Sequence, residues 1–81
     1  MKKYVELVKK WLANPESVSL EELKANKEAA WAATWDIRDA AAMAAHAAYW
    51  ADYEAADAIY GADYWRNEAI KYIKEYEELT K

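Results

Sequence analysis

The residues best suited to binding a ligand stand between Glu28 and Trp65, where most positions are Ala, Trp, Tyr or an acid. Arg38 and His46 lie among the rings of this stretch. A guanidinium group can stack on an indole and still bind a phosphate or carboxylate with two donors. Arg66 directly follows Trp65 and offers the same chemistry. The pattern predicts a slot in which flat rings sandwich a base or similar ring while arginine holds an anionic group.

The spacing of these residues predicts that most of them share one face of a helix. In blocks of eleven from Trp31, large rings recur at matching positions, and eleven residues make three turns of about 3.67 residues, close to the natural helical period. The rings would then form one nearly straight stripe, with Trp31, Trp35, Tyr49 and Tyr53 stacking on the ligand. The predicted ligand-binding residues are this stripe with Arg66: Trp31, Trp35, Arg38, His46, Tyr49, Tyr53, Tyr60, Tyr64 and Arg66.

Motifs of catalysis and metal binding are missing from the sequence. The chain has no Cys and one His, which excludes a thiol nucleophile and a His-rich metal site within one chain. It has no phosphate-binding glycine loop, no nucleophile elbow and no Glu-x-x-His pair. The acid pairs of the middle, such as Asp36 with Asp39, do not supply the buried carboxylates that hydrolysis needs. We therefore expect a non-enzymatic binder without metal or cofactor.

The elements that must position the stripe are predicted to be helices. Pro15 and Gly61 are the only helix breakers in the sequence, and Ser19 with Glu22 forms a capping box that starts a second helix at about Leu20. Val18 and Leu23 are placed to form the accompanying hydrophobic staple. Alanine, the best helix former, dominates from there to Tyr60. The expected fold is all-α, one domain over 1–81, with helices at about 3–13, 20–60 and 63–79.

A helix over 20–60 would be roughly 60 Å long and could not bury its own stripe of rings. Folding back as a hairpin would need a turn for which the sequence has no Gly or Pro. Pairing between chains is therefore expected, as a helical homo-oligomer and most simply a dimer. A bend near Asp36 or Asp52 is the alternative.

Charge and hydropathy exclude several classes of partner. The net charge of −4 argues against general nucleic-acid binding, which requires many Lys and Arg on the phosphates. The sequence has neither a secretory leader nor an uncharged apolar run long enough for a membrane span. We expect a cytoplasmic protein with no membrane partner.

Two interpretations of the rings remain open. Aromatic residues at helical spacing are usually core, with alanines opposite them allowing close helix approach. However, all twelve aromatic residues are Tyr or Trp and none is Phe. Buried O–H and N–H groups need hydrogen-bond partners, so this choice is more typical of an interface or a ligand slot that is half wet.

The stretches "YVELVKKWLANPESVSLEELKANKEAAWAA" and "AIKYIKEYEELTK", with the Ala/Trp/Tyr middle, resemble small helical phage and bacterial proteins that are labelled immunity proteins. The likeness extends over nearly the whole chain, and "WLANP.SVS.EEL" is its sharpest piece. The resemblance implies defence or counter-defence, by blocking a toxin or by sequestering a nucleotide signal.

The sequence thus favours a binder that sequesters a ring-bearing, anionic, nucleotide-like molecule. The alternatives are a protein-binding immunity or inhibitor module that acts on a basic protein partner, and a structural helical oligomer whose rings are wholly internal.

Overall fold

A computed structural model describes residues 2–33, 39–56 and 62–79 of the chain, and all the elements of this part are helical. The α-helices are α1 (Lys2–Ala13), α2 (Leu20–Ala32), α3 (Ala40–Ala56) and α4 (Ala62–Leu79), and a short 3₁₀ turn, η1 (Pro15–Ser17), follows α1. The predicted all-α class is confirmed. None of the described helices is both long enough and apolar enough to cross a membrane.

Local signals set the first two helix boundaries. Asn14 begins η1, because its side-chain oxygen accepts from the Glu16 N–H at 3.3 Å. Ser19 caps α2: its hydroxyl accepts from the Glu22 N–H at 3.1 Å, and the Glu22 carboxylate accepts from the Ser19 N–H at 3.2 Å. This reciprocal pair is the predicted capping box. Val18 and Leu23, the expected staple residues, are buried in the same core cluster.

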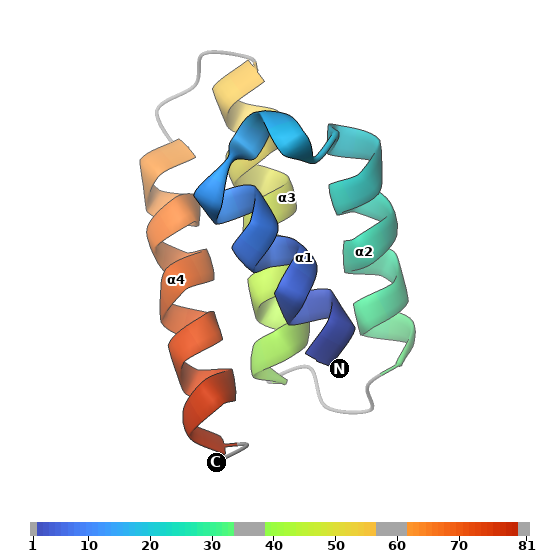
Figure 1. Cartoon of the computed structure of the whole chain (residues 1–81), viewed down its shortest axis with the longest axis vertical. Coiled ribbons are helices and arrows are strands. Elements are labelled where there is room, and N and C mark those ends of the chain that lie inside the picture. Colours follow the sequence, from blue (N-terminus) through green and yellow to red (C-terminus); the bar gives the residue numbers. More distant parts are fainter. Residues whose placement is uncertain (1, 34–38, 57–61, 80–81) are drawn as a thin grey trace.

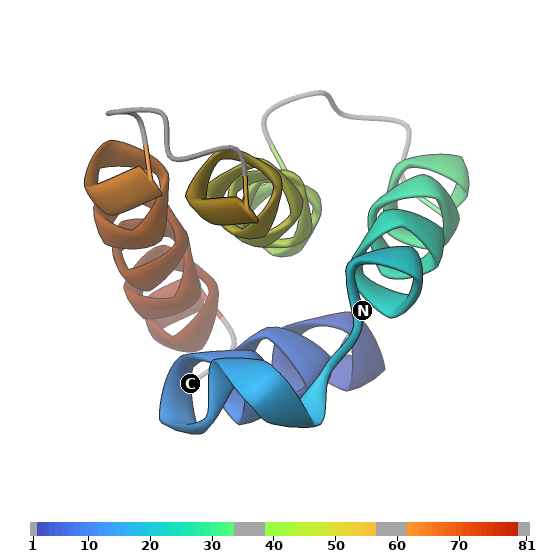
Figure 2. The same ribbon diagram turned by 90° about the horizontal axis from the view of Figure 1, so that it is seen from above.

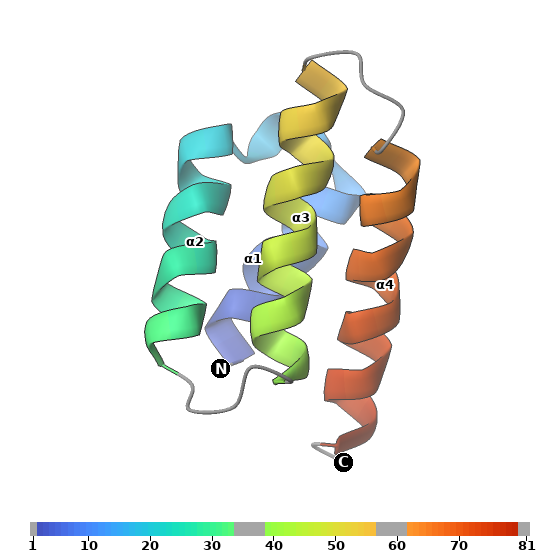
Figure 3. The same ribbon diagram turned by 180° about the vertical axis from the view of Figure 1, so that it is seen from behind.

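The middle of the chain differs from the predicted continuous helix over 20–60, which is wrong. α2 and α3 are separate helices that lie side by side and antiparallel (Figure 1), as the view from behind also shows (Figure 3). Asp39 caps α3, since its carboxylate accepts from the N–H groups of Ala41 and Ala42 at 2.9 and 3.2 Å. Helix propensity is a weak prior that packing overrides. Of the two positions where a bend was expected, Asp52 lies inside α3 and Asp36 lies outside the described residues.

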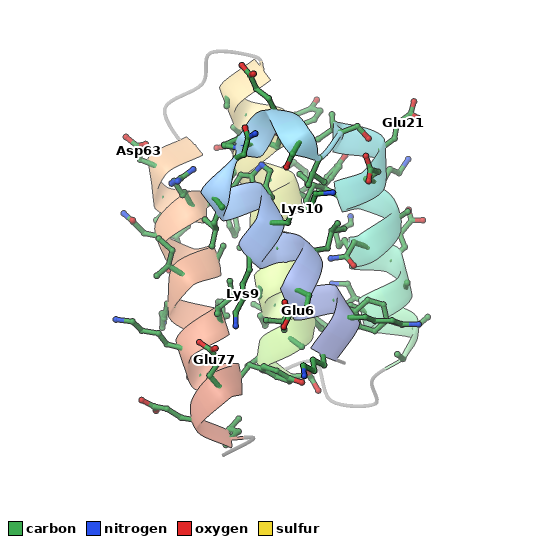
Figure 4. The ribbon with its side chains drawn as sticks, viewed as in Figure 1. Glu6, Lys9, Lys10, Glu21, Asp63 and Glu77 are labelled. Carbon is green, nitrogen blue, oxygen red and sulfur yellow. The ribbon has the colours of Figure 1, made fainter. Side chains whose placement is uncertain are left out.

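The four helices form a layer of three with one helix across it. α3 lies between α2 and α4, and α1 covers one face of this layer (Figure 2). Asn26 of α2 ties α2 to α1 by donating to the Tyr4 carbonyl at 3.1 Å, and Lys9 of α1 pairs with Glu77 of α4 at 2.7 Å (Figure 4). The chain therefore shields much of its apolar surface by folding back, so a second chain is not required to bury that surface.

The core beneath α1 is built largely from alanine. Val5, Val8 and Trp11 of α1 are buried in one core with α3, whose buried residues are all alanines: Ala40, Ala41, Ala42, Ala44, Ala45, Ala47, Ala48 and Ala51. Small side chains let helix backbones approach closely. As a result, the large side chains of α3 lie on the other side of the helix.

Candidate functional site

The large rings of α3 lie on its side opposite α1. At about 100° per residue, His46, Trp50 and Tyr53 fall on the same side of the helix. Asp52, which accepts from the Trp11 indole N–H of α1 at 3.3 Å, falls on the opposite side. The burial pattern agrees, because His46 and Trp50 are half-buried and Tyr53 is exposed while the alanines are buried. α3 thus places its small residues inside and its rings outside, the reverse of the usual distribution.

Rings from the two neighbouring helices extend this layer. The His46 imidazole lies 6.3 Å from the Trp31 ring of α2, 5.6 Å from the Trp65 ring of α4 and 6.2 Å from the Trp50 ring, measured between centroids. We call this connected set the aromatic face; its members are Trp31, His46, Tyr49, Trp50, Tyr53, Tyr64 and Trp65.

The rings of the aromatic face contact one another edge to face. Six of the seven ring pairs have interplanar angles between 62° and 87°, and the seventh, between Tyr49 and Tyr53, has 30° at 6.1 Å. Edge-to-face pairs are the favoured packing of aromatic side chains. A flat ligand held as in a sandwich would need two parallel rings with a gap between them. The described rings therefore form a packed, half-exposed surface.

Two charged groups accompany the aromatic face. The Lys27 ammonium lies 4.5 Å from the centroid of the Tyr49 ring. Burial, and secondarily the positive charge of Lys27, lowers the pKa of His46 below 6.5, so the imidazole is neutral at pH 7. Glu54 lies half-buried beside Trp50 and Tyr53 on α3, and no described residue donates a hydrogen bond to its buried Oε2 atom.

The structure brings together five of the nine predicted ligand-binding residues, namely Trp31, His46, Tyr49, Tyr53 and Tyr64. They come from three helices, so the prediction of a single straight stripe along one helix is wrong. Trp35, Arg38 and Tyr60 lie outside the described residues.

Arg66, the ninth predicted residue, lies away from the aromatic face. Its guanidinium group lies 5.7 Å from the Trp11 ring of α1 and donates to the Leu12 carbonyl at 3.2 Å. Neighbours in sequence point to different sides of a helix, so Arg66 turns toward α1 whereas Trp65 joins His46.

Sequence reasoning missed Trp50, Trp65 and Lys27 as parts of this surface. For Trp50 a signal was present, because it follows His46 by four residues and so shares its helix face. For Trp65 and Lys27 no local signal exists, since both reach α3 from other helices.

Within the described ranges, no three His, Asp or Glu side chains gather as a metal site would require. Comparison of the chain with protein-family models, with curated proteins and with solved structures gives no match.

Proposed function

We propose that the protein is a non-enzymatic binding module that attaches to a basic protein partner through the aromatic face. The observation that carries this proposal is the inverted distribution on α3, where eight alanines are buried while the rings stay accessible. Tyr53 keeps 39% and Tyr64 keeps 59% of its surface exposed. Tyr and Trp are enriched in protein interfaces because each joins a large apolar ring to one polar group.

Charge favours a partner that is basic. The chain carries a net charge of −4, and Glu54, four residues after Trp50 on α3, has an oxygen to which no described residue donates a hydrogen bond. The negative charge of this carboxylate would attract an Arg or Lys of a partner toward the surface. The same cation would lie against aromatic faces, which attract it. This role agrees with the inhibitor function that the resemblance to immunity proteins implies.

Sequestration of a nucleotide-like molecule is a separate proposal. Its support is Lys27, a cation beside Tyr49 and near His46 that could meet an anionic group. The edge-to-face packing of the described rings gives less support for a stacked base. We therefore place protein binding first.

The test compares variants of two apolar residues with the same exposure. Tyr53 of the aromatic face and Ile70 of α4 are each 39% exposed. The full-length chain, immobilised as wild type, Tyr53→Ser, Glu54→Gln or Ile70→Ser, is used to capture proteins from the cells that encode it. We expect one stoichiometric basic protein on the wild type and on Ile70→Ser. Its affinity, remeasured with purified partner, should fall about 10- to 100-fold for Tyr53→Ser and for Glu54→Gln.

Equal binding by Tyr53→Ser and Ile70→Ser would reject the aromatic face as the binding surface. Capture of no protein, together with a nucleotide released on heating the purified chain, would favour sequestration instead. Mass spectrometry of the released small molecules distinguishes these two results.

A further inference from the structure

A second candidate site lies on the other side of α3, where α1, α3 and α4 meet. A pocket of about 170 Å³ is lined there by Trp11 and Pro15, by Ala51, Asp52 and Ala55 of α3, and by Arg66 of α4, with Asp63 also on its lining. Asp63 is exposed at the end of α4 (Figure 4). A pocket of this volume has room for ordered water or for a small ligand.

The pocket is lined by charged groups of both signs. Arg66 and Asp52 both line it, yet they form no ion pair, and among the described residues neither has another charged partner. Each is instead held by a neutral group of the α1 segment. Arg66 donates to the Leu12 carbonyl and lies over the Trp11 ring, and the Trp11 indole N–H donates to Asp52 Oδ1.

These contacts orient both charged groups in the absence of a ligand. A guanidinium group has five N–H donors, so one bond to Leu12 leaves others for an anionic group. Asp52 receives one hydrogen bond at 3.3 Å on Oδ1, and no described residue donates to its second oxygen. Preorganised groups of this kind lose little entropy when they bind. Between them, Trp11, Pro15 and the two alanines give the pocket an apolar wall.

We propose that this pocket binds a small zwitterion, an α-amino acid with a small side chain. Its carboxylate meets Arg66, its ammonium group meets Asp52 with Asp63 at the entrance, and its side chain lies against Trp11 and Ala55. A simple anion would leave Asp52 unpaired and would be repelled by two carboxylates. A simple cation would likewise be repelled by the positive charge of Arg66. The site is separate from the aromatic face and does not depend on the proposed protein partner.

The test is a titration of the full-length, ¹⁵N-labelled chain with L-alanine, followed at the Trp11 indole N–H signal. For a ligand of this size we expect a dissociation constant of about 1 mM. Acetate and ethylammonium each supply one charge, and each should bind at least about 10-fold more weakly. The proposal is overturned if L-alanine leaves the Trp11 signal unmoved at about 10 mM, or if acetate alone moves it equally.

Two variants show whether the pocket itself is responsible. Ala55→Leu fills the pocket from an exposed helical position and should abolish the shift, whereas Ala25→Leu, an exposed alanine of α2 remote from the pocket, should keep it. Arg66→Lys keeps the charge but not the forked geometry and should weaken binding about 10-fold. Unchanged binding in Ala55→Leu with an intact spectrum would contradict the assignment.

Discussion

His46 stands where the rings of three tryptophans meet, and its surroundings favour the neutral imidazole. Burial lowers its pKa below 6.5, and Lys27 adds a smaller effect in the same direction. A neutral imidazole can contact Trp31, Trp50 and Trp65 without the desolvation cost of a charge. The histidine therefore acts as a ring at the centre of the aromatic face at neutral pH. At the scale of the single residue, this makes the packing of the face sensitive to protonation.

The pKa of His46 predicts how stability changes with pH. Because the folded-state pKa lies below the unfolded value of about 6.5, the unfolded chain binds the proton more readily as pH falls through 6.5. The free energy of unfolding should therefore be higher above pH 6.5 and should decrease as pH falls toward the folded pKa. Chemical denaturation at several pH values from about 7.5 down to about 5 measures this slope.

The matched variant is His46→Gln, which cannot titrate in this range and should lose that part of the slope. A titration of the imidazole signals by NMR gives the folded pKa directly. A midpoint at or above 6.5, or an unchanged slope in His46→Gln, would contradict the prediction.

At the scale of the helix, α3 is defined by the difference between its two sides. Its buried alanines let α1, α2 and α4 all contact it, while its rings lie outside. A core made of Leu or Ile at those positions would hold the neighbouring helices farther away. The close approach of α4 to α3 thus depends on side-chain volume at particular alanines.

This dependence predicts that enlarging a buried alanine is harmful. Ala44 of α3 is 0% exposed, so Ala44→Leu forces an extra volume into a packed core and should lower the free energy of unfolding by about 1–3 kcal/mol. Ala25→Leu, on the exposed side of α2, should change it by less than about 0.5 kcal/mol. Urea denaturation of the two variants measures both effects. Equal stability of both would mean that the alanines do not set the helix spacing.

The helices differ in how far the sequence alone could predict them. The end of α1 and the start of α2 follow from Asn14-Pro15 and from Ser19 with Glu22, because these are contacts between near neighbours. The separation of α2 from α3 could not be predicted in this way, because alanine favours helix in either arrangement and the gain comes from burial between helices. Asp39 was the one local hint, as a capping residue before an alanine run.

In the candidate site, too, contacts between near neighbours could be predicted from the sequence, and contacts between distant segments could not. The spacing of His46, Tyr49 and Tyr53 along α3 was readable from the sequence, and these rings do lie together. The position of Arg66 could not be predicted from the sequence, because its partners Trp11 and Leu12 are more than fifty residues away along the chain. Contacts between distant segments depend on the packing of whole helices, which periodicity does not determine.

At the scale of the whole molecule, the chain is short, acidic and folded on itself. Its Cα radius of gyration is 11.5 Å, close to the roughly 12 Å that a globular chain of this length has, and it measures 35 × 21 × 20 Å. One side of the helical layer is covered by α1 (Figure 2). The aromatic face lies on the side of α3 away from α1. The question at this scale is whether a second copy covers that face. Two copies would bring together two chains that each carry a net charge of −4, which disfavours their association.

We therefore expect the isolated protein to be a compact monomer. Sedimentation and small-angle X-ray scattering at micromolar concentration should give a mass of 9.4 kDa and a radius of gyration near that of the folded chain. A particle of twice this mass that dissociates in Tyr53→Ser but not in Ile70→Ser would instead show that a second copy occupies the aromatic face. A dimer unaffected by either substitution would place the contact elsewhere. A monomer leaves the aromatic face free for a basic partner, whereas a second copy on this face would compete with that partner for the same rings.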